Sequence, residues 1–384
     1  MNSPQFLSVR TVARTLLGVV TISSHLLAAD LPPLPARQDI PMAGPETDGP
    51  YAPRTIVPGG VVVPLYPTDS PMLNLERVHE AEVYGSYSPP SLGYIVNIHS
   101  PSIEFHAGNG SLNTGVAIIV AAGGGHNVLN IVGEGADVVG YFASRGISTI
   151  LLRNRLRKDG YEPKTDGVYD MQQAIKLVRA YADEWNIDPE KIGVLGFSAG
   201  AELCAGAGLF YEDFDVAQNQ AGNPLKDVSS RPDFIGLVYP GPSPFFNGGE
   251  VAIPRDAPPA FFAGPAWGDW IHALWSTEYF TALLNDGVPN VEIHLYARGV
   301  HPGDRGKAGQ APATAGITSR DGVAFGRWQE RYIDWLDDLG FMAKPGVITR
   351  AALDVAANLE RDNPLEVMRE RRAERERAAA AKAD

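Results

Sequence analysis

A serine between two glycines is the residue of this chain best suited to covalent chemistry. Residues 196–200 have the sequence Gly-Phe-Ser-Ala-Gly, with Ser198 at the centre. A short apolar run (191–195) of strand character precedes them, and an Ala- and Leu-rich segment (199–210) of helical character follows. Between a strand and a helix, the two glycines permit a turn tight enough to lift the serine hydroxyl clear of the sheet. This context predicts a nucleophilic Ser198, and a plain loop serine is the alternative.

A serine hydroxyl is a poor nucleophile unless a base accepts its proton, and a neutral imidazole is suited to do so. The chain has eight histidines, and His301 is the one that follows the last predicted strand and lies among turn residues. We therefore predict that His301 is the base. A histidine on an ordinary surface loop is the alternative.

The acid that fixes the tautomer of the base should follow a strand and lie between Ser198 and His301 in the chain. Asp269 meets both conditions, because it follows the apolar segment 260–263 in a loop. The chain order Ser198, Asp269, His301 is the order of α/β-hydrolases. An aspartate that only caps the next helix is the alternative.

Acyl transfer also needs hydrogen-bond donors aimed at the developing oxyanion. Residues 123–126, Gly-Gly-Gly-His, follow a predicted strand, and a glycine run there lets backbone N–H groups face the site. The predicted oxyanion hole consists of the amides of Gly124, Gly125 and Ala199. A merely flexible glycine loop is the alternative.

Alternating strands and helices are expected to hold these residues. Apolar runs of strand character occur at 116–120, 147–152, 192–197, 234–239, 260–263 and 291–296. Apolar residues with helical spacing occur at 170–185 and 325–339, and Gly340 ends the second helix. Such alternation predicts an α/β fold, with a mostly parallel sheet covered by helices on both faces. Ligands bind such sheets at the carboxyl ends of the strands, where Ser198 lies.

Composition excludes several classes of function. The chain has 384 residues, of which 44% are hydrophobic and 20% charged, and a net charge of −13. This acidity argues against a nucleic-acid partner and favours a neutral substrate over a polyanion. Cys204 is the single cysteine, so neither an internal disulfide nor a cysteine metal cluster is possible. A small buried apolar role is expected for it rather than that of a reactive thiol.

The two ends of the chain differ from its body. Residues 1–29 have the order of a secretory signal peptide: arginines, an apolar stretch and small residues. The segment 30–80 is rich in Pro and Gly and is predicted to be an extended arm. The catalytic α/β domain is placed at 81–345, and 346–384 is predicted to be a charged, solvated tail. No later stretch is long enough for a membrane span, so an exported protein, secreted or periplasmic, is expected.

Five short motifs and the end of the domain resemble the acetylxylan-esterase-like α/β-hydrolases, which are related to carbohydrate acetyl esterases and feruloyl esterases. The similar segments are 123–126, 133–135, 153–156, 185–189, 196–200, and His301 with 328–341. The resemblance extends over 83–341, about two thirds of the chain. It implies an α/β-hydrolase fold and a Ser-His-Asp triad. The substrate is less well defined, because close relatives include peptidases of the prolyl-oligopeptidase type.

The chain departs from the family at two points. Residues 299–302 are Gly-Val-His-Pro, where the family usually has Gly-Gly-His-Gly. Around the acid, 267–270 are Trp-Gly-Asp-Trp instead of an Asp-Asp pair followed by a hydrophobic residue. These departures bear on the substrate pocket more than on the triad. We assign His126, Trp267 and Trp270 to substrate binding, and packing of these aromatic residues under long loops is the alternative.

The resulting prediction is a secreted serine esterase that deacetylates plant-type polysaccharides such as xylan through an acyl-enzyme. Neither a metal nor an organic cofactor is expected. The alternatives are a feruloyl esterase, a general carboxylesterase, a prolyl-oligopeptidase-like peptidase and a non-catalytic binding protein of the same fold. The expected partner is a small or oligosaccharide ester, and the sequence does not fix the oligomeric state.

Overall fold

A computed structural model describes residues 31, 33–34, 49–87, 92–219, 223–246, 248–301, 324–361 and 364–380. The predicted signal segment 1–29 lies outside the described residues. Among the described helices, none is both long and apolar enough to cross a membrane.

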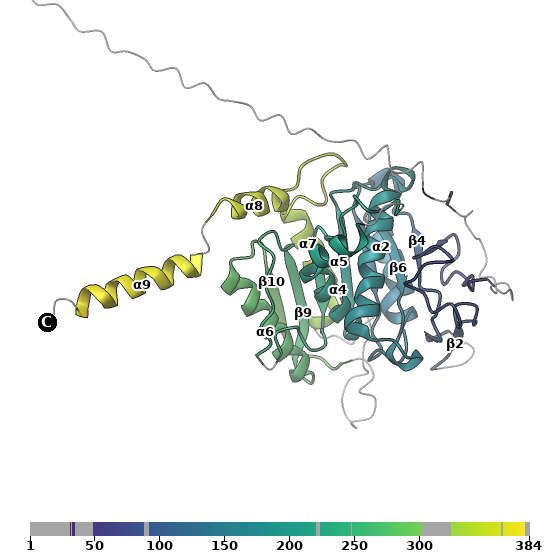
Figure 1. The fold of residues 1–384 in the computed structure, drawn as a ribbon, viewed down its shortest axis with the longest axis horizontal. Helices are drawn as coiled ribbons and strands as arrows, with labels where there is room; N and C mark the ends of the chain where they lie inside the picture. Colours follow the sequence, from purple (N-terminus) through teal and green to yellow (C-terminus); the bar gives the residue numbers. More distant parts are fainter. Residues whose placement is uncertain are drawn as a thin grey trace, which may run out of the picture.

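The centre of the molecule is an eight-stranded sheet with the strand order β1-β4-β6-β5-β7-β8-β9-β10 (Figure 1). The strands from β6 to β10 along this order are parallel, whereas β1 pairs with β4, and β4 with β6, in antiparallel fashion. Two further strands, β2 and β3, form a separate antiparallel pair. The bounds are β1 Val61–Pro64, β2 Val83–Gly85, β3 Tyr94–Val96, β4 Ser102–His106, β5 Ala117–Ala121, β6 Ser148–Arg153, β7 Ile192–Phe197, β8 Ile235–Val238, β9 Ala260–Trp267 and β10 Glu292–Arg298.

The apolar runs of the sequence become the parallel strands because both faces of the sheet are buried. Every residue of β5 is buried, and its side chains alternate between the two faces. Ile119 packs in the cluster that contains the apolar residues of α2 and α4, whereas Ile118 and Val120 pack in the cluster that contains those of α1 and α7. The six predicted strands correspond to β5 to β10, and the predicted fold class is confirmed.

The helices flank the sheet, and α2, α4 and α5 lie together beside its middle strands (Figure 1). The bounds are α1 Asp137–Ala143, α2 Val168–Ala180, α3 Ala182–Trp185, α4 Ala199–Leu209, α5 Tyr211–Gln218, α6 Trp270–Asp286, α7 Trp328–Asp338, α8 Arg350–Leu359 and α9 Pro364–Ala380. The described part of the chain also contains five short helical turns: Gly110–Leu112, Val132–Ala136, Arg157–Asp159, Pro163–Gly167 and Ala324–Arg327.

The prediction of an extended arm over 30–80 is wrong for residues 61–66. Strand β1 adds to the edge of the central sheet, and Leu65 and Tyr66 after it join the buried core. The arm is also fastened by a buried carboxylate: Oε1 of Glu104 in β4 accepts hydrogen bonds from the backbone N–H of Ile56 at 2.8 Å and of Val57 at 3.0 Å. This part of the arm therefore belongs to the domain.

The prediction of a solvated tail over 346–384 is wrong for helix α8. Thr349 caps the start of α8 by accepting a hydrogen bond from the N–H of Ala352 at 3.0 Å. On the inner face of the helix, Ala351 and Val355 are buried, and Ala351 joins the cluster around α1 and α7. Helix α9 matches the prediction better, since the described side chains of its Arg- and Glu-rich stretch are mostly exposed.

Candidate active site

Ser198 occupies a strained turn between β7 and α4. Its backbone has φ +50° and ψ −121°, a conformation that residues with a side chain rarely adopt. The flanking glycines are required by close contacts: a Cβ on Gly196 would lie 2.4 Å from Cα of Ala201, and one on Gly200 would lie 2.1 Å from the carbonyl oxygen of Ala121. This is the geometry of a nucleophile elbow, which presents the hydroxyl above the sheet.

The structure brings the three residues of the predicted triad together. Oγ of Ser198 lies 3.1 Å from Nε2 of His301, and Nδ1 of His301 lies 2.9 Å from Oδ2 of Asp269. Both distances are within the range of hydrogen bonds. The three side chains follow β7, β9 and β10, so they meet at the carboxyl edge of the parallel strands.

The loops that carry Asp269 and His301 pack closely against each other at Gly268. Gly268 has φ +101°, and a Cβ there would lie 2.0 Å from the carbonyl oxygen of Gly299. The loops are connected by a hydrogen bond from the N–H of Gly299 to the carbonyl of Trp267 at 3.1 Å. A side chain at 268 would push the two loops apart, and with them the acid and the base.

Asp269 immediately precedes α6, but its carboxylate does not cap that helix. Instead, the carboxylate accepts hydrogen bonds from two histidines, His272 and His301. Burial opposes ionisation, but the hydrogen bonds from the two histidines together with their electrostatic attraction lower the pKa of Asp269 below its ordinary value. Asp269 is therefore a carboxylate anion at neutral pH.

The glycine loop after β5 lies against the nucleophile. Gly124 and Gly125 have φ of +130° and +62°. A Cβ on Gly123 would lie 2.9 Å from Cβ of Ser198. Among the described residues, no acceptor takes a hydrogen bond from the amide of Gly124, Gly125 or Ala199. These three predicted oxyanion donors are therefore available to a ligand.

Two residues that the sequence analysis did not assign hold this loop in place. Glu134 is 1% exposed, and its carboxylate accepts a hydrogen bond from the N–H of Gly123 at 2.7 Å and one from the hydroxyl of Tyr239 at 2.9 Å. The ring of Tyr239 also packs edge-on against His301, with centroids 5.0 Å apart. The signal in the sequence is Glu134 itself, an acid between two glycines, eight positions after the end of the glycine loop.

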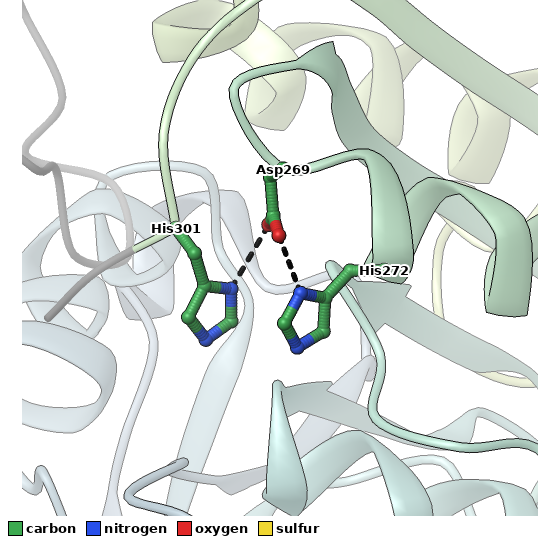
Figure 2. Close-up of side chains that lie close together, drawn as sticks. All are labelled: Asp269, His272 and His301. Atoms are coloured by element: carbon green, nitrogen blue, oxygen red, sulfur yellow. Dashed lines mark hydrogen bonds and ion pairs between the residues drawn. The ribbon is translucent and has the colours of Figure 1, made fainter. Parts of the chain in front are cut away.

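A third unassigned residue, His272, shares the acid with His301. Its Nδ1 hydrogen-bonds to Oδ1 of Asp269, while His301 uses Oδ2 (Figure 2). The two imidazole rings are stacked, with centroids 3.9 Å apart and planes inclined by 5°. Ligand atoms of the three residues lie within 4.8 Å of one another, a spacing that a metal ion could also use. The signal in the sequence is a histidine three residues after the acid, at the start of a helix.

The predicted substrate-binding residues lie around this centre. His126, on the glycine loop, is 4% exposed, and its Nε2 lies 3.4 Å from Oε1 of Glu202 without a hydrogen-bond partner among the described residues. Trp267 and Trp270, on either side of Gly268 and Asp269, are 78% and 63% exposed. They are not packed under loops.

A cavity of about 280 Å³ lies beside α4 and begins one helical turn after Ser198, at Glu202. Its walls are mostly apolar and come from the start of α2, one face of α4 and the loop after β8: Pro163, Lys164, Val168, Glu202, Leu203, Gly206, Phe210, Pro242, Ser243, Pro244, Phe246 and Val251.

This sheet topology, with an elbow after β7, defines an α/β-hydrolase, and solved structures show the same fold. The acetyl ester-xyloside bifunctional hydrolase from Caldicellulosiruptor lactoaceticus is 23% identical, with a TM-score of 0.53, and the match covers 73% of this chain and 96% of that one. The carboxylesterase Cest-2923 from Lactobacillus plantarum is 17% identical, with a TM-score of 0.51 and coverages of 68% and 98%.

Residues 107–235, about a third of the chain, match the BD-FAE family. The chain is also 34% identical over 127 residues to an acetylxylan esterase of Xylanibacter ruminicola and 38% identical over 72 residues to endo-1,4-beta-xylanase B of Butyrivibrio fibrisolvens. The first match covers 33% of this chain and the second 18%. They span only 23% and 11% of the length of those two proteins.

Proposed function

We propose that the protein is a serine esterase that removes acetyl groups from plant-type polysaccharides such as xylan. The observation that carries this proposal is the continuous series of hydrogen bonds from Asp269 through His301 to Ser198, beside a glycine loop with available amides. The match to the BD-FAE family and to an acetylxylan esterase supports the choice of a carbohydrate ester.

In the proposed reaction, Oγ of Ser198 attacks the ester carbonyl carbon while its proton moves to Nε2 of His301. Asp269, ionised and bonded to Nδ1, stabilises the resulting imidazolium. The tetrahedral intermediate collapses as His301 returns the proton to the departing sugar oxygen, which leaves an acyl-enzyme on Ser198. Water then attacks the acyl group with His301 again as the base, and acetate and free Ser198 result.

The negative charge on the carbonyl oxygen would be stabilised by the amides of Gly124, Gly125 and Ala199. One such donor contributes on the order of 3 kcal/mol to the stabilisation of a transition state. The amide of Ala199 has the further advantage of lying at the N-terminus of α4, where the helix dipole favours negative charge.

We assign the sugar to the polar and aromatic groups around the triad. His126 offers a buried Nε2 with unused hydrogen-bonding capacity, which suits a sugar hydroxyl. The exposed rings of Trp267 and Trp270 offer apolar faces on which pyranose rings stack. A neutral polysaccharide also suits a chain with a net charge of −13.

The cavity beside α4 favours a second candidate, the feruloyl esterase. A volume of about 280 Å³ lined by Phe210, Phe246 and three prolines accommodates an aromatic acyl group, which an acetyl ester does not need. The same triad would serve both reactions, so only the acyl specificity separates the two candidates.

The test is release of acetate from acetylated xylo-oligosaccharides by the purified protein, alongside release of ferulate from methyl ferulate, with Ser198→Ala as the control. Acetate release that is lost in the control supports the first proposal, and ferulate release alone supports the second. Cleavage of an aryl acetate but of neither substrate would retain the serine mechanism and refute the polysaccharide assignment.

Variants at the tryptophans test the assignment of the sugar. Trp267→Ala and Trp270→Ala should raise KM for the oligosaccharide while leaving kcat/KM for an aryl acetate unchanged. Equal effects on both substrates would contradict a sugar-stacking role.

We also propose that residues 1–29 direct export. Their order of arginines, apolar residues and small residues supports this proposal. N-terminal sequencing of the protein from a secreting host tests it: a mature chain that begins near Asp30 is expected, and an intact Met1 in the cytoplasm would contradict it.

A further inference from the structure

We propose that His272 is a positioning residue for catalysis: it holds the Asp269 carboxylate and the His301 ring through one hydrogen bond and one ring stack. This inference rests on the proposed serine-esterase mechanism. It adds a fourth side chain to the three that the sequence motifs indicate.

The hydrogen bonds fix the protonation of both rings. A carboxylate anion only accepts hydrogen bonds, so each imidazole that bonds to Asp269 carries a proton on the bonded nitrogen, Nδ1. Each Nε2 is then the basic nitrogen when its ring is neutral. Figure 2 shows the two rings side by side with both Nδ1 atoms toward Asp269 and both Nε2 atoms on the opposite side. His272 therefore repeats the orientation of the base.

His272 is itself fixed by its surroundings. It lies in the first turn of α6, three residues after Asp269, so the helix sets the distance between the two. Trp275 packs edge-on against the His272 ring, with centroids 5.0 Å apart, and the hydroxyl of Ser276 bonds to the His272 carbonyl at 2.8 Å. His301 lies on a separate loop after β10. Because its ring stacks on the His272 ring with centroids 3.9 Å apart, the fixed His272 ring restrains the orientation of the His301 ring.

His272 and His301 hydrogen-bond to the same carboxylate, so the negative charge of Asp269 is shared between the two rings. Among the described residues, the titratable groups that face His301 are Asp269 from the loop before α6, His272 from α6, Glu134 from the turn after the glycine loop, and Tyr239 directly after β8. Of these, His272 is the one that competes directly for the acid. Without its N–H, all of the charge on Asp269 would be available to His301, and the imidazolium would form more readily.

Two matched variants separate the hydrogen bond from the packing. His272→Phe keeps a flat ring for the stack but removes the donor, whereas His272→Asn keeps an N–H near the position of Nδ1 but removes the ring. For His272→Phe we expect kcat to fall on the order of tenfold with little change in KM, and the acid limb of the kcat/KM profile to move to higher pH. For His272→Asn the acid limb should stay at its wild-type position.

Wild-type kinetics in both variants would overturn the proposal. Equal losses of kcat in the two variants, with the acid limb of the kcat/KM profile at its wild-type position, would also overturn it, because His272 would then act through packing alone. Thermal unfolding of both variants checks that they fold.

A proton NMR spectrum tests the arrangement without activity. The wild-type protein and Ser198→Ala should each show two far-downfield imidazole N–H resonances, and His272→Phe should show one. A single resonance in the wild type would refute the shared carboxylate. Full activity in Ser198→Ala would instead refute the proposed function and leave this result standing.

Discussion

Glu134 offers the sharpest test of how the glycine loop is held. Its buried carboxylate accepts hydrogen bonds from the N–H of Gly123 and from the hydroxyl of Tyr239, so Glu134→Ala removes both hydrogen bonds. Tyr239 is fully buried, and Gly123 is enclosed by Glu134 itself and the nucleophile turn. The buried N–H of Gly123 would lose its hydrogen-bond acceptor, and a buried polar group left without a partner costs about 1–3 kcal/mol, so the variant should lose roughly 1–3 kcal/mol of unfolding free energy.

The matched control is Glu134→Gln. The amide oxygen of glutamine can accept from Gly123, and its NH₂ can donate to the oxygen of Tyr239, so both groups keep a partner. The activity of Glu134→Gln should stay near that of the wild type. Glu134→Ala should lose kcat on the order of a hundredfold, because the amides of Gly124 and Gly125 are then no longer held in place.

The direction of the pKa shift of Glu134 determines how its contribution to folding stability changes with pH. Burial raises the pKa of Glu134, and the hydrogen bonds from Tyr239 and Gly123 lower it by less. A carboxyl group whose pKa is higher in the folded state stabilises the fold most below its unfolded pKa of about 4.3. This contribution declines as the pH rises through the window between the unfolded and the folded pKa. The advantage of Glu134→Gln over the wild type should therefore grow with pH across that window.

The assays are urea unfolding of the three proteins at several pH values and hydrolysis of an aryl acetate. Wild-type stability and activity in Glu134→Ala would refute the reasoning. An advantage of Glu134→Gln that shrinks as the pH rises would refute the assigned direction of the pKa shift.

Two further predictions concern the glycine loop and the single cysteine. Gly124→Ala should abolish activity, because φ at this position is +130° and the new Cβ would lie 2.0 Å from the carbonyl oxygen of Val128. Gly140→Ala in α1 should leave activity intact, because its Cβ would meet no atom within 4 Å. Hydrolysis of an aryl acetate compares the two variants. Cys204 is fully buried and burial raises its pKa, so a thiol reagent should label it only after unfolding, and labelling of the native protein would contradict this.

The sequence was sufficient to predict the parallel strands and the residues directly after them. Strands β5, β6 and β7 are buried on both faces, so their apolar runs were visible without a partner strand. Ser198, Asp269 and His301 could then be selected by type and by place after a strand, and the structure brings these three side chains together.

The antiparallel edge of the sheet was not predictable in this way. Strand β4 contains Glu104 and His106, and charged residues argue against a buried strand. Glu104 is nevertheless fully buried because Arg153 of the neighbouring β6 bonds to it at 2.5 Å and the arm supplies two backbone N–H donors. The residue types along one segment of the sequence do not reveal such a pairing with a distant segment.

The supporting side chains were missed for a related reason. Glu134 and Tyr239 are 105 positions apart, and neither has a role until the fold places both beside the glycine loop. His272 was closer to prediction, because it lies one helical turn from the acid that it contacts. A search for donors three residues after a candidate acid would have found it.

The proposed role of Ser198 as the nucleophile is tested most directly by covalent trapping. The purified protein is treated with a fluorophosphonate, which labels activated serines, and the adduct is located by mass spectrometry of the intact chain and its peptides. We predict one adduct per chain, on Ser198, with loss of ester hydrolysis in proportion to labelling and no adduct in Ser198→Ala. An adduct on another residue, or undiminished hydrolysis after complete labelling of Ser198, would contradict the proposed mechanism.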